Sequence, residues 1–360
     1  MLFEAKCQTT AMGSMPHGDI GKALSLALDM DIPFWPQLPR ITYSEDMFVQ
    51  FARDFPGVTI DPANEKIEFH THKFEEDLVQ YTEMLSHPEA LTINSNTSLS
   101  YNRFLEIELD QYIAIRGHVT GPINLGFQII DDDGRPIIYD DDLRELLFDF
   151  IQRKVNIQYW QLTQKNRNAF VWLDDPGFWW VFSSTTGYND VKAKHDYIEF
   201  LSGIDGPKAL HMCVNVNLPY LFDLGINILS VDTYQLETIP KEYASAIVDF
   251  LEHDGIICWG MVPTESATLN TESTETLSNR LTSLWESISK NTGISPDQIA
   301  AQALLSPARC CLRNPQQAGP DRIKSHDSCE SSRSVEENLV ERSFLITKEI
   351  SAILKHRYGF

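Results

Sequence analysis

Four side chains of metal-binding type lie in the second half of the sequence. His211 and Cys213 are separated by one residue, and Asp232 and Cys310 follow further along the chain. Together they offer one imidazole nitrogen, one carboxylate oxygen and two sulfurs, a set that Zn²⁺ accepts in tetrahedral geometry. A His-x-Cys pair alone is weak evidence, because neutral histidines and buried cysteines are common in protein cores. The sequence therefore predicts a zinc site on the condition that the fold brings these residues together.

The composition limits the class of protein. With 42% hydrophobic and 22% charged residues, the 360-residue chain is typical of globular proteins. Its formal net charge of −22 would repel a phosphate backbone, so we expect no nucleic-acid partner. No basic region followed by an apolar stretch opens the chain, and no run of about 18 apolar residues occurs. We expect a soluble, cytoplasmic protein without a membrane partner, whose six cysteines are reduced thiols or metal ligands.

Short apolar or β-branched runs alternate with longer segments of helical period, which is typical of a parallel sheet built from βα units. We expect eight strands, at 9–12, 32–35, 113–116, 170–173, 209–211, 228–231, 256–259 and 303–305. The pattern predicts an α/β protein with a single (β/α)8 TIM barrel over residues 1–360, although a doubly wound open sheet fits the periodicity almost as well. No Gly-x-Gly-x-x-Gly follows the first strand, which weakens the open-sheet alternative.

Three segments between the strands have a clear helical period. One begins behind a capping aspartate at 140 or 141, one spans about 239–254 and ends at Gly255, and one begins near Thr274. Insertions interrupt the alternation: a long stretch between the second and third strands, a hairpin that turns at Asp133–Gly134, and a polar segment, 314–338, that we expect to be a loop before a last helix.

The barrel hypothesis requires functional side chains to gather where strands end, because the active face of such barrels is built from the βα loops. The first predicted strand is followed by Gly13–Ser14, and the fourth by Asp174-Asp175-Pro176-Gly177. The His-x-Cys pair, Asp232 and Cys310 also follow strands. The candidate residues therefore fall at the positions that this fold predicts.

These strand ends resemble a known family. The segments TTAMGSMP, GHVTGPI, FVWLDDPG, LHMCVN, ILSVDT and SPARCCL are similar, in order, to the strand-end motifs of the catalytic domain of cobalamin-independent methionine synthase. They also resemble its core-type, single-barrel relatives in the superfamily of uroporphyrinogen decarboxylase. The resemblance implies a zinc-dependent methyltransferase of methionine biosynthesis, with zinc held by His211, Cys213, Asp232 and Cys310. Asp232 stands where the family has glutamate, and Cys311 replaces a glycine, which leaves open whether Asp232 ligates and which of the two adjacent thiols does so.

The same resemblance implies a substrate site. Ser14 matches the serine that holds the carboxylate of homocysteine, and Asp174 matches the aspartate that holds its ammonium group. Glu45 is an uncertain counterpart of a loop glutamate that also contacts the ammonium. The chain has one barrel and no histidine in CWGMVPT after the seventh strand, whereas the full-length synthases have a second barrel and a histidine there. Both differences favour a methylated corrinoid protein, rather than a methylated folate, as the methyl donor.

Three alternatives stay open at this point. A sister methyltransferase could act on a thiol without an amino group, although Asp174 argues against it. A decarboxylase of the uroporphyrinogen type needs no zinc and would require basic residues for substrate carboxylates, whereas these strand ends are acidic and rich in thiols. A barrel that binds metal or a corrinoid partner without turnover is the alternative from a different class.

Overall fold

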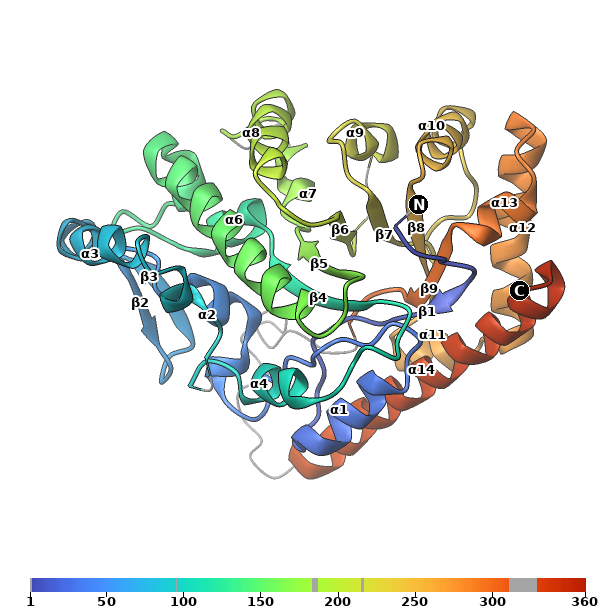
Figure 1. Cartoon of the computed structure of the whole chain (residues 1–360), viewed down its shortest axis with the longest axis horizontal. Helices are drawn as coiled ribbons and strands as arrows, with labels where there is room; N and C mark the ends of the chain where they lie inside the picture. Colours follow the sequence, from blue (N-terminus) through green and yellow to red (C-terminus); the bar gives the residue numbers. More distant parts are fainter. Residues whose placement is uncertain (1, 95, 183–186, 215–216, 311–328) are drawn as a thin grey trace.

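The computed structural model describes residues 2–94, 96–182, 187–214, 217–310 and 329–360. Its centre is a curled sheet of seven parallel strands in the order β1-β9-β8-β7-β6-β5-β4 (Figure 1). The strands are β1 (Gln8–Thr9), β4 (Ile115–Thr120), β5 (Ala169–Asp174), β6 (Lys208–Met212), β7 (Ile228–Asp232), β8 (Ile256–Val262) and β9 (Ala303–Pro307). Each lies at or beside a predicted strand, so the predicted α/β class and parallel sheet are confirmed.

The eighth predicted strand, at 32–35, is not a regular strand. The segment lies between the edge strands β1 and β4, where Ile32 N donates to Thr9 O at 2.9 Å and Arg116 N donates to Pro33 O at 3.0 Å. Its pairing consists of isolated bridges, Phe34 with Arg116 and Gln37 with Ser14. Pro33 and Pro36 lack backbone N–H groups, so this segment cannot form a continuous ladder. The described sheet is therefore a curled half-barrel of seven strands whose edges this segment bridges.

Helices lie around the curled sheet (Figure 1). They are α1 (Ile20–Leu28), α2 (Met47–Ala52), α3 (Thr71–Met84), α4 (Leu99–Glu106), α5 (Pro122–Gln128), α6 (Asp141–Thr163), α7 (Phe178–Val181), α8 (Asp190–Ser202), α9 (Leu218–Phe222), α10 (Lys241–Glu252), α11 (Ser266–Leu269), α12 (Thr274–Thr292), α13 (Pro296–Ala301) and α14 (Cys329–Tyr358). The three helices expected from periodicity are α6, α10 and α12. Asp140 caps α6 by accepting from Leu143 N, and Ser273 and Thr276 form a capping box at the start of α12.

The insertion between β1 and β4 contains α2, α3, α4 and an antiparallel hairpin of β2 (Val58–Asp61) and β3 (Lys66–Phe69). Three short 3-10 helices complete the described elements: η1 (Tyr43–Glu45), η2 (Pro88–Leu91) and η3 (Ile137–Tyr139). The turn predicted at Asp133–Gly134 is present, with Gly134 at φ 76° and an antiparallel bridge between Ile130 and Pro136. A residue other than glycine would be strained at that φ.

The last helix is longer than predicted. α14 begins at Cys329, so the expectation of a loop over 329–338 is wrong, while 311–328 lie outside the described residues. Val340 and Phe344 of α14 pack with Ala23 and Ala27 of α1. These apolar contacts stabilise the first half of α14 against α1. In Figure 1 the two helices lie side by side. No helix in the described ranges is long and apolar enough to span a membrane.

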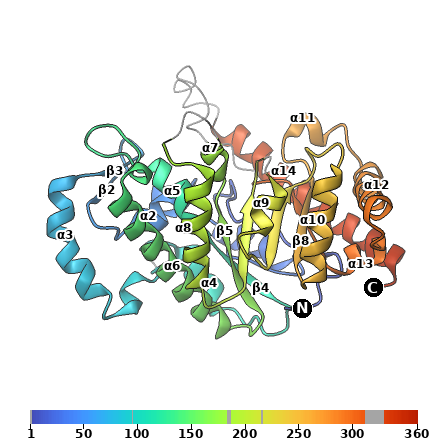
Figure 2. The ribbon, with the colours of Figure 1, turned by 90° about the horizontal axis from the view of Figure 1, so that it is seen from above.

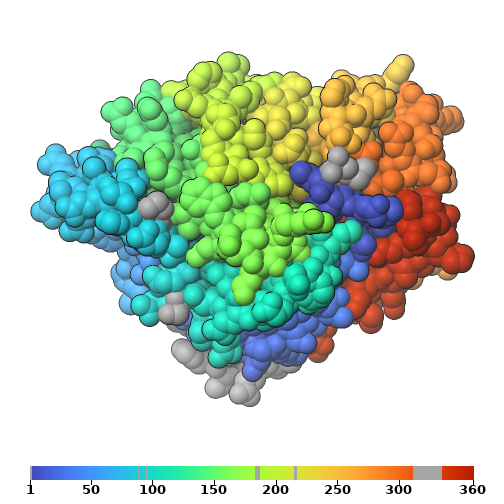
Figure 3. All heavy atoms as spheres, in the orientation of Figure 1, coloured from blue at the N-terminus to red at the C-terminus, as the bar shows by residue number. Residues whose placement is uncertain are grey.

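The inside of the curled sheet is filled by side chains rather than open. Phe170, Trp172, Ile256 and Cys258 pack there with Phe3, whose ring stacks on Phe170 at 5.7 Å between centroids. The N-terminal residues, dark blue in Figure 3, lie against the segment before β9, where Lys6 N donates to Ala301 O at 3.0 Å. Figure 2 shows α7 and α11, which follow β5 and β8, at the edge opposite the N-terminus. A site on this fold therefore belongs at the carboxyl edge of the sheet.

Candidate metal centre

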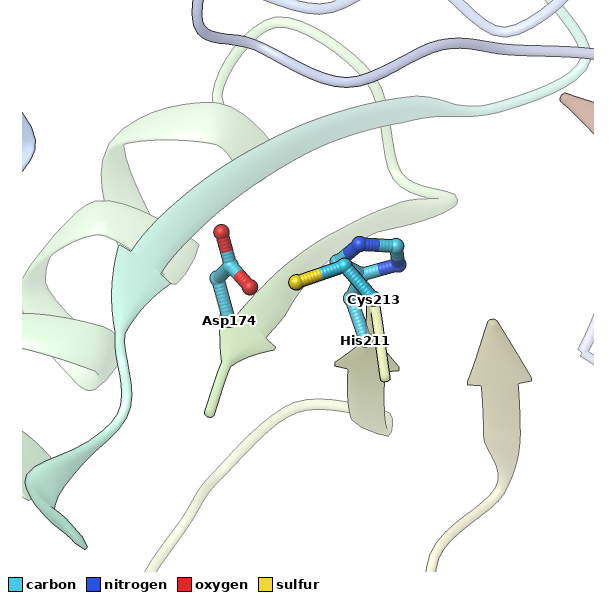
Figure 4. Close-up of side chains that lie close together, drawn as sticks. All are labelled: Asp174, His211 and Cys213. Atoms are coloured by element: carbon cyan, nitrogen blue, oxygen red, sulfur yellow. The ribbon is translucent and has the colours of Figure 1, made fainter. Parts of the chain in front are cut away.

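Three side chains converge at the carboxyl ends of β5 and β6. One potential ligand atom from each of Asp174, His211 and Cys213 lies within 4.8 Å of the others (Figure 4). Asp174 is the last residue of β5 and pairs in register with His211 on β6, and Cys213 follows the last residue of β6. The parallel register therefore places the carboxylate predicted to bind substrate beside the predicted zinc pair.

His211 is buried and held from behind. Its Nδ1 lies 2.9 Å from the hydroxyl oxygen of Ser230, which belongs to the neighbouring strand β7, and its ring stacks on Trp172. Burial lowers the pKa of His211 to about 3, and the nearby charge of Arg116 acts in the same direction. The imidazole is therefore neutral at physiological pH, which is the form that binds a metal ion.

Cys213 and Asp174 are both disfavoured as anions when no cation is present. Burial raises the pKa of the Cys213 thiol well above its ordinary value, and the neighbouring Asp174 raises it further. Burial also raises the pKa of Asp174 to about 7, with Arg116 acting in the opposite direction. The Oδ1 atom of Asp174 is buried and has no hydrogen-bond partner among the described residues. A cation bound between these groups would stabilise both anions.

A buried arginine, Arg116, lies beside this group and was not among the predicted site residues. The Arg116 guanidinium packs between the rings of Phe34 and Trp172, with its Cζ 4.6 and 4.1 Å from their centroids, and its Nε donates to the Thr10 hydroxyl at 3.0 Å. His118 lies beside it and stacks on Trp35. A period of two in the sequence could have revealed these residues, because Arg116 and His118 occupy alternate positions of β4 and therefore lie on the same face of the sheet.

Asp232 lies outside the group of three. Its Oδ2 accepts from Gln235 Nε2 at 2.7 Å and from Arg309 Nε at 3.1 Å, and it lies 2.9 Å from Arg309 Nη2. This ion pair joins the end of β7 to the segment that follows β9. The expected zinc-ligand role of Asp232 stays a prediction, and the structure gives its carboxylate a guanidinium partner.

Cys310 is exposed and is also not in the group of three. It lines a small crevice with Ser14, Met12 and Arg309, which places the predicted second thiolate beside the predicted carboxylate-binding serine. Cys311 lies outside the described residues, so the choice between the two thiols stays open. The described residues thus bring together His211 and Cys213 from the predicted zinc set, with Asp174 as their neighbour.

Ser14 is fixed by the loop that carries it. Its hydroxyl donates to Gln37 Oε1 at 3.2 Å, and Gln37 Nε2 donates to Gln50 Oε1 at 2.7 Å. Gln50 in turn donates to Glu45, whose carboxylate also accepts from the Ser98 hydroxyl at 2.8 Å and the Leu99 N–H at 2.9 Å. Glu45 is buried, and its hydrogen bonds hold the start of α4. These contacts explain why a glutamate is buried at this position even when no ligand is bound.

The adjacent aspartate, Asp175, has a structural role. Its carboxylate accepts from Asn124 N at 2.7 Å and Ile123 N at 3.2 Å at the start of α5. A Cβ on Gly121 would lie 2.1 Å from Asp175 Oδ2, so glycine is required for this approach. Of the two adjacent carboxylates, Asp174 serves the candidate site and Asp175 caps a helix.

Comparison with known proteins supports the same fold. No protein-family model and no curated protein sequence matches the chain. A methyltransferase from Methanosarcina mazei has a TM-score of 0.53 at 12% identity, over 99% of this chain and 95% of that chain. A B12-independent methionine synthase from a Shewanella species, in complex with selenomethionine, has a TM-score of 0.53 at 12% identity, over 98% of each chain. Identities this low show a shared fold alone, so the resemblance found in the sequence motifs is confirmed at the level of the fold.

Proposed function

We propose that the protein is a zinc-dependent methyltransferase that transfers a methyl group from a methylated corrinoid protein to homocysteine and forms methionine. The observation that carries this proposal is the imidazole, thiol and carboxylate within 4.8 Å at the carboxyl ends of neighbouring parallel strands. The fold shared with methyltransferases and methionine synthases supports the reaction class.

The donor set fits zinc. Zn²⁺ binds sulfur, imidazole nitrogen and carboxylate oxygen, and catalytic zinc sites use three protein ligands plus an open position. The buried, unpartnered Oδ1 of Asp174 marks a polar atom that a cation would satisfy. In this proposal His211, Cys213 and Cys310 would hold the metal, and a carboxylate would occupy the fourth position when no substrate is bound.

The chemistry that zinc supplies when bound is the loss of a thiol's proton near neutral pH, with the sulfur still nucleophilic. The chain's own residues orient the acceptor. Ser14 would hold the carboxylate of homocysteine, and Asp174 would accept from its ammonium, because a buried ammonium requires an ionised partner. The sulfur then attacks the methyl carbon in line: the S–C bond forms, the bond to the donor breaks, and the thiol proton leaves to solvent.

The choice of donor rests on the end of β8 and the residues that follow it. That segment contains Thr264, which is buried, and no histidine over 258–264. A folate-dependent synthase of the kind that the sequence resembles has a histidine at this position. We therefore propose a methylated corrinoid donor.

Metal content and a turnover assay test the proposal together. Elemental analysis of the full chain should give one zinc per chain, and methionine should form from homocysteine with methylcobalamin as a soluble donor. Methionine formation from methyl-tetrahydrofolate, with none from methylcobalamin, would overturn the donor assignment. One zinc per chain without methyl transfer from either donor would favour the non-catalytic metal-binding alternative, and absence of zinc with decarboxylase activity would favour the uroporphyrinogen type.

A further inference from the structure

Two carboxylates flank the His211–Cys213 pair, one on each neighbouring strand. Asp174 ends β5 and Asp232 ends β7, while the pair belongs to β6, which lies between them in the sheet. Both strand positions could supply the oxygen ligand of a metal held by the pair. The family resemblance implies the metal-ligand role for Asp232 and substrate binding for Asp174, and the contacts of the two carboxylates distinguish these assignments.

One oxygen of the Asp232 carboxylate is engaged without a metal. Its Oδ2 accepts from Gln235 and is paired with two nitrogens of the Arg309 guanidinium, whereas its Oδ1 is buried with no hydrogen-bond partner among the described residues. The side chain of Asp232 is 2% exposed, so this ion pair is shielded from water on the aspartate side. A guanidinium paired with a carboxylate reduces the negative charge available to a divalent cation, and its removal would leave a buried charge without a partner.

Asp174 differs from Asp232 in having no guanidinium partner within the described ranges. Like Asp232 Oδ1, Asp174 Oδ1 is buried without a hydrogen-bond partner, but no ion pair to Asp174 occurs among the described residues. The nearest buried cation is Arg116, whose Nε is committed to Thr10 and whose Cζ faces two aromatic rings. Asp174, rather than Asp232, contributes the oxygen atom within 4.8 Å of the His211 nitrogen and the Cys213 sulfur.

We infer that Asp174 is the oxygen ligand of the metal and that Arg309 keeps Asp232 out of the ligand set. This inference rests on the proposed function only in requiring a metal at the His211–Cys213 pair. The Asp232–Arg309 ion pair then serves as a brace, because Arg309 is the residue directly before Cys310 and ties that segment to the end of β7. The two oxygens of the Asp174 carboxylate allow one to bind the metal while the other accepts from a substrate ammonium.

Cobalt is the probe for this assignment, since Co²⁺ occupies zinc sites and its visible spectrum reports ligand type and geometry. The full chain, stripped with a chelator, would be titrated with Co²⁺ as wild type, Asp174→Asn and Asp232→Asn. We expect Asp174→Asn to weaken Co²⁺ binding by about 100-fold or more and to shift the d–d bands, because outer-shell substitutions already cost about 10- to 100-fold. Asp232→Asn should change the affinity by less than about 10-fold and leave the d–d bands in place.

A second pair of variants gives a signal that loss of folding cannot produce. Asp174→Cys should add thiolate-to-cobalt charge-transfer absorption to that of the wild type, whereas Asp232→Cys should not. The reverse pattern in either pair, with Asp232 sensitive and Asp174 tolerant, would overturn the inference and leave the proposed metal site standing. Failure of the wild type to bind Co²⁺ or Zn²⁺ would overturn both the inference and the zinc-dependent function.

Discussion

His211 Nδ1 and Ser230 Oγ lie 2.9 Å apart, across the boundary between β6 and β7. Ser230 is fully buried, and its hydroxyl also acts on the Cys258 thiol of β8, because Ser230 and Ser306 both lower the pKa of that thiol against the larger rise that burial causes. A chain of short polar groups inside the curled sheet thus sets the orientation of the imidazole at the candidate site. Such outer contacts fix the ring plane of metal-binding histidines.

Replacing Ser230 by alanine should weaken metal binding. We expect Ser230→Ala to lower Zn²⁺ affinity by about 10- to 100-fold, because the imidazole loses the hydrogen bond that orients it. Competition with a chelating dye measures this affinity. Ser306→Ala is the matched control, since it removes the hydroxyl on the other side of Cys258 and leaves His211 untouched. Equal losses in the two variants would show that the whole polar chain, rather than the His211 contact, supports the site.

Removal of one candidate sulfur should remove the metal. Cys213→Ser is expected to lose most of its bound zinc, because a serine hydroxyl is a far weaker zinc ligand than a thiolate. Cys258→Ser is the control, as Cys258 is buried between two serines and lies outside the group of three. Elemental analysis after gel filtration gives the zinc content of each variant. Full zinc occupancy in Cys213→Ser would rule out the assigned ligand.

The loop that carries Ser14 should tolerate no side chain at Gly13. A Cβ at that position would lie 2.2 Å from Cε1 of the buried His118 ring, whereas a Cβ on Gly18 in the same loop would meet nothing within 4 Å. Gly13→Ala should therefore cost about 1–3 kcal/mol of unfolding free energy, in the range of overpacked cores, and raise KM for the thiol substrate. Gly18→Ala should change neither quantity. Urea unfolding and steady-state kinetics test this, and equal stability of the two variants would contradict the packing argument.

The stability of the fold should fall in mild acid through His17. This residue is fully buried, and burial lowers its pKa, with Glu337, Glu341 and Asp19 opposing that shift and Lys22 adding to it. Since the folded pKa lies below the unfolded value of about 6.5, the unfolded chain binds the proton more readily. The contribution of neutral His17 to the unfolding free energy is therefore complete above about pH 6.5, and it is lost as the pH falls from there towards the folded pKa of His17.

The variant His17→Gln isolates this contribution, because glutamine does not titrate and the other buried histidines remain. Its unfolding free energy should decrease less steeply between about pH 7 and 5 than that of the wild type. The comparison uses the slopes, so a constant loss of stability in the variant does not affect it. Parallel pH dependences for the two proteins would mean that protonation of His17 does not weaken the fold.

Much of the architecture was predictable from local pattern. Runs such as 228–231 and 256–259 became strands because apolar residues occupy both of their faces instead of alternating with polar ones. Such runs must be buried on both sides, as the strands of a parallel sheet are. Capping at Asp140 and the apolar spacing after Thr274 placed α6 and α12 at their observed starts. The segment at 32–35 departed from its prediction because two prolines removed the donors that a ladder needs.

The candidate site was predictable only in part. Sequence placed His211, Cys213, Asp174 and Ser14 at strand ends, because residues that follow buried strands face the same edge of a parallel sheet. It could not decide which carboxylate would approach the pair, since that depends on where Arg309, distant in sequence, meets Asp232. It also could not show that Asp175 caps α5, or reveal Arg116 beneath the site. Residue types and spacing determined which groups are available, whereas partner choice among buried charges was decided by tertiary packing, because an ion pair forms only between groups that the fold brings into contact.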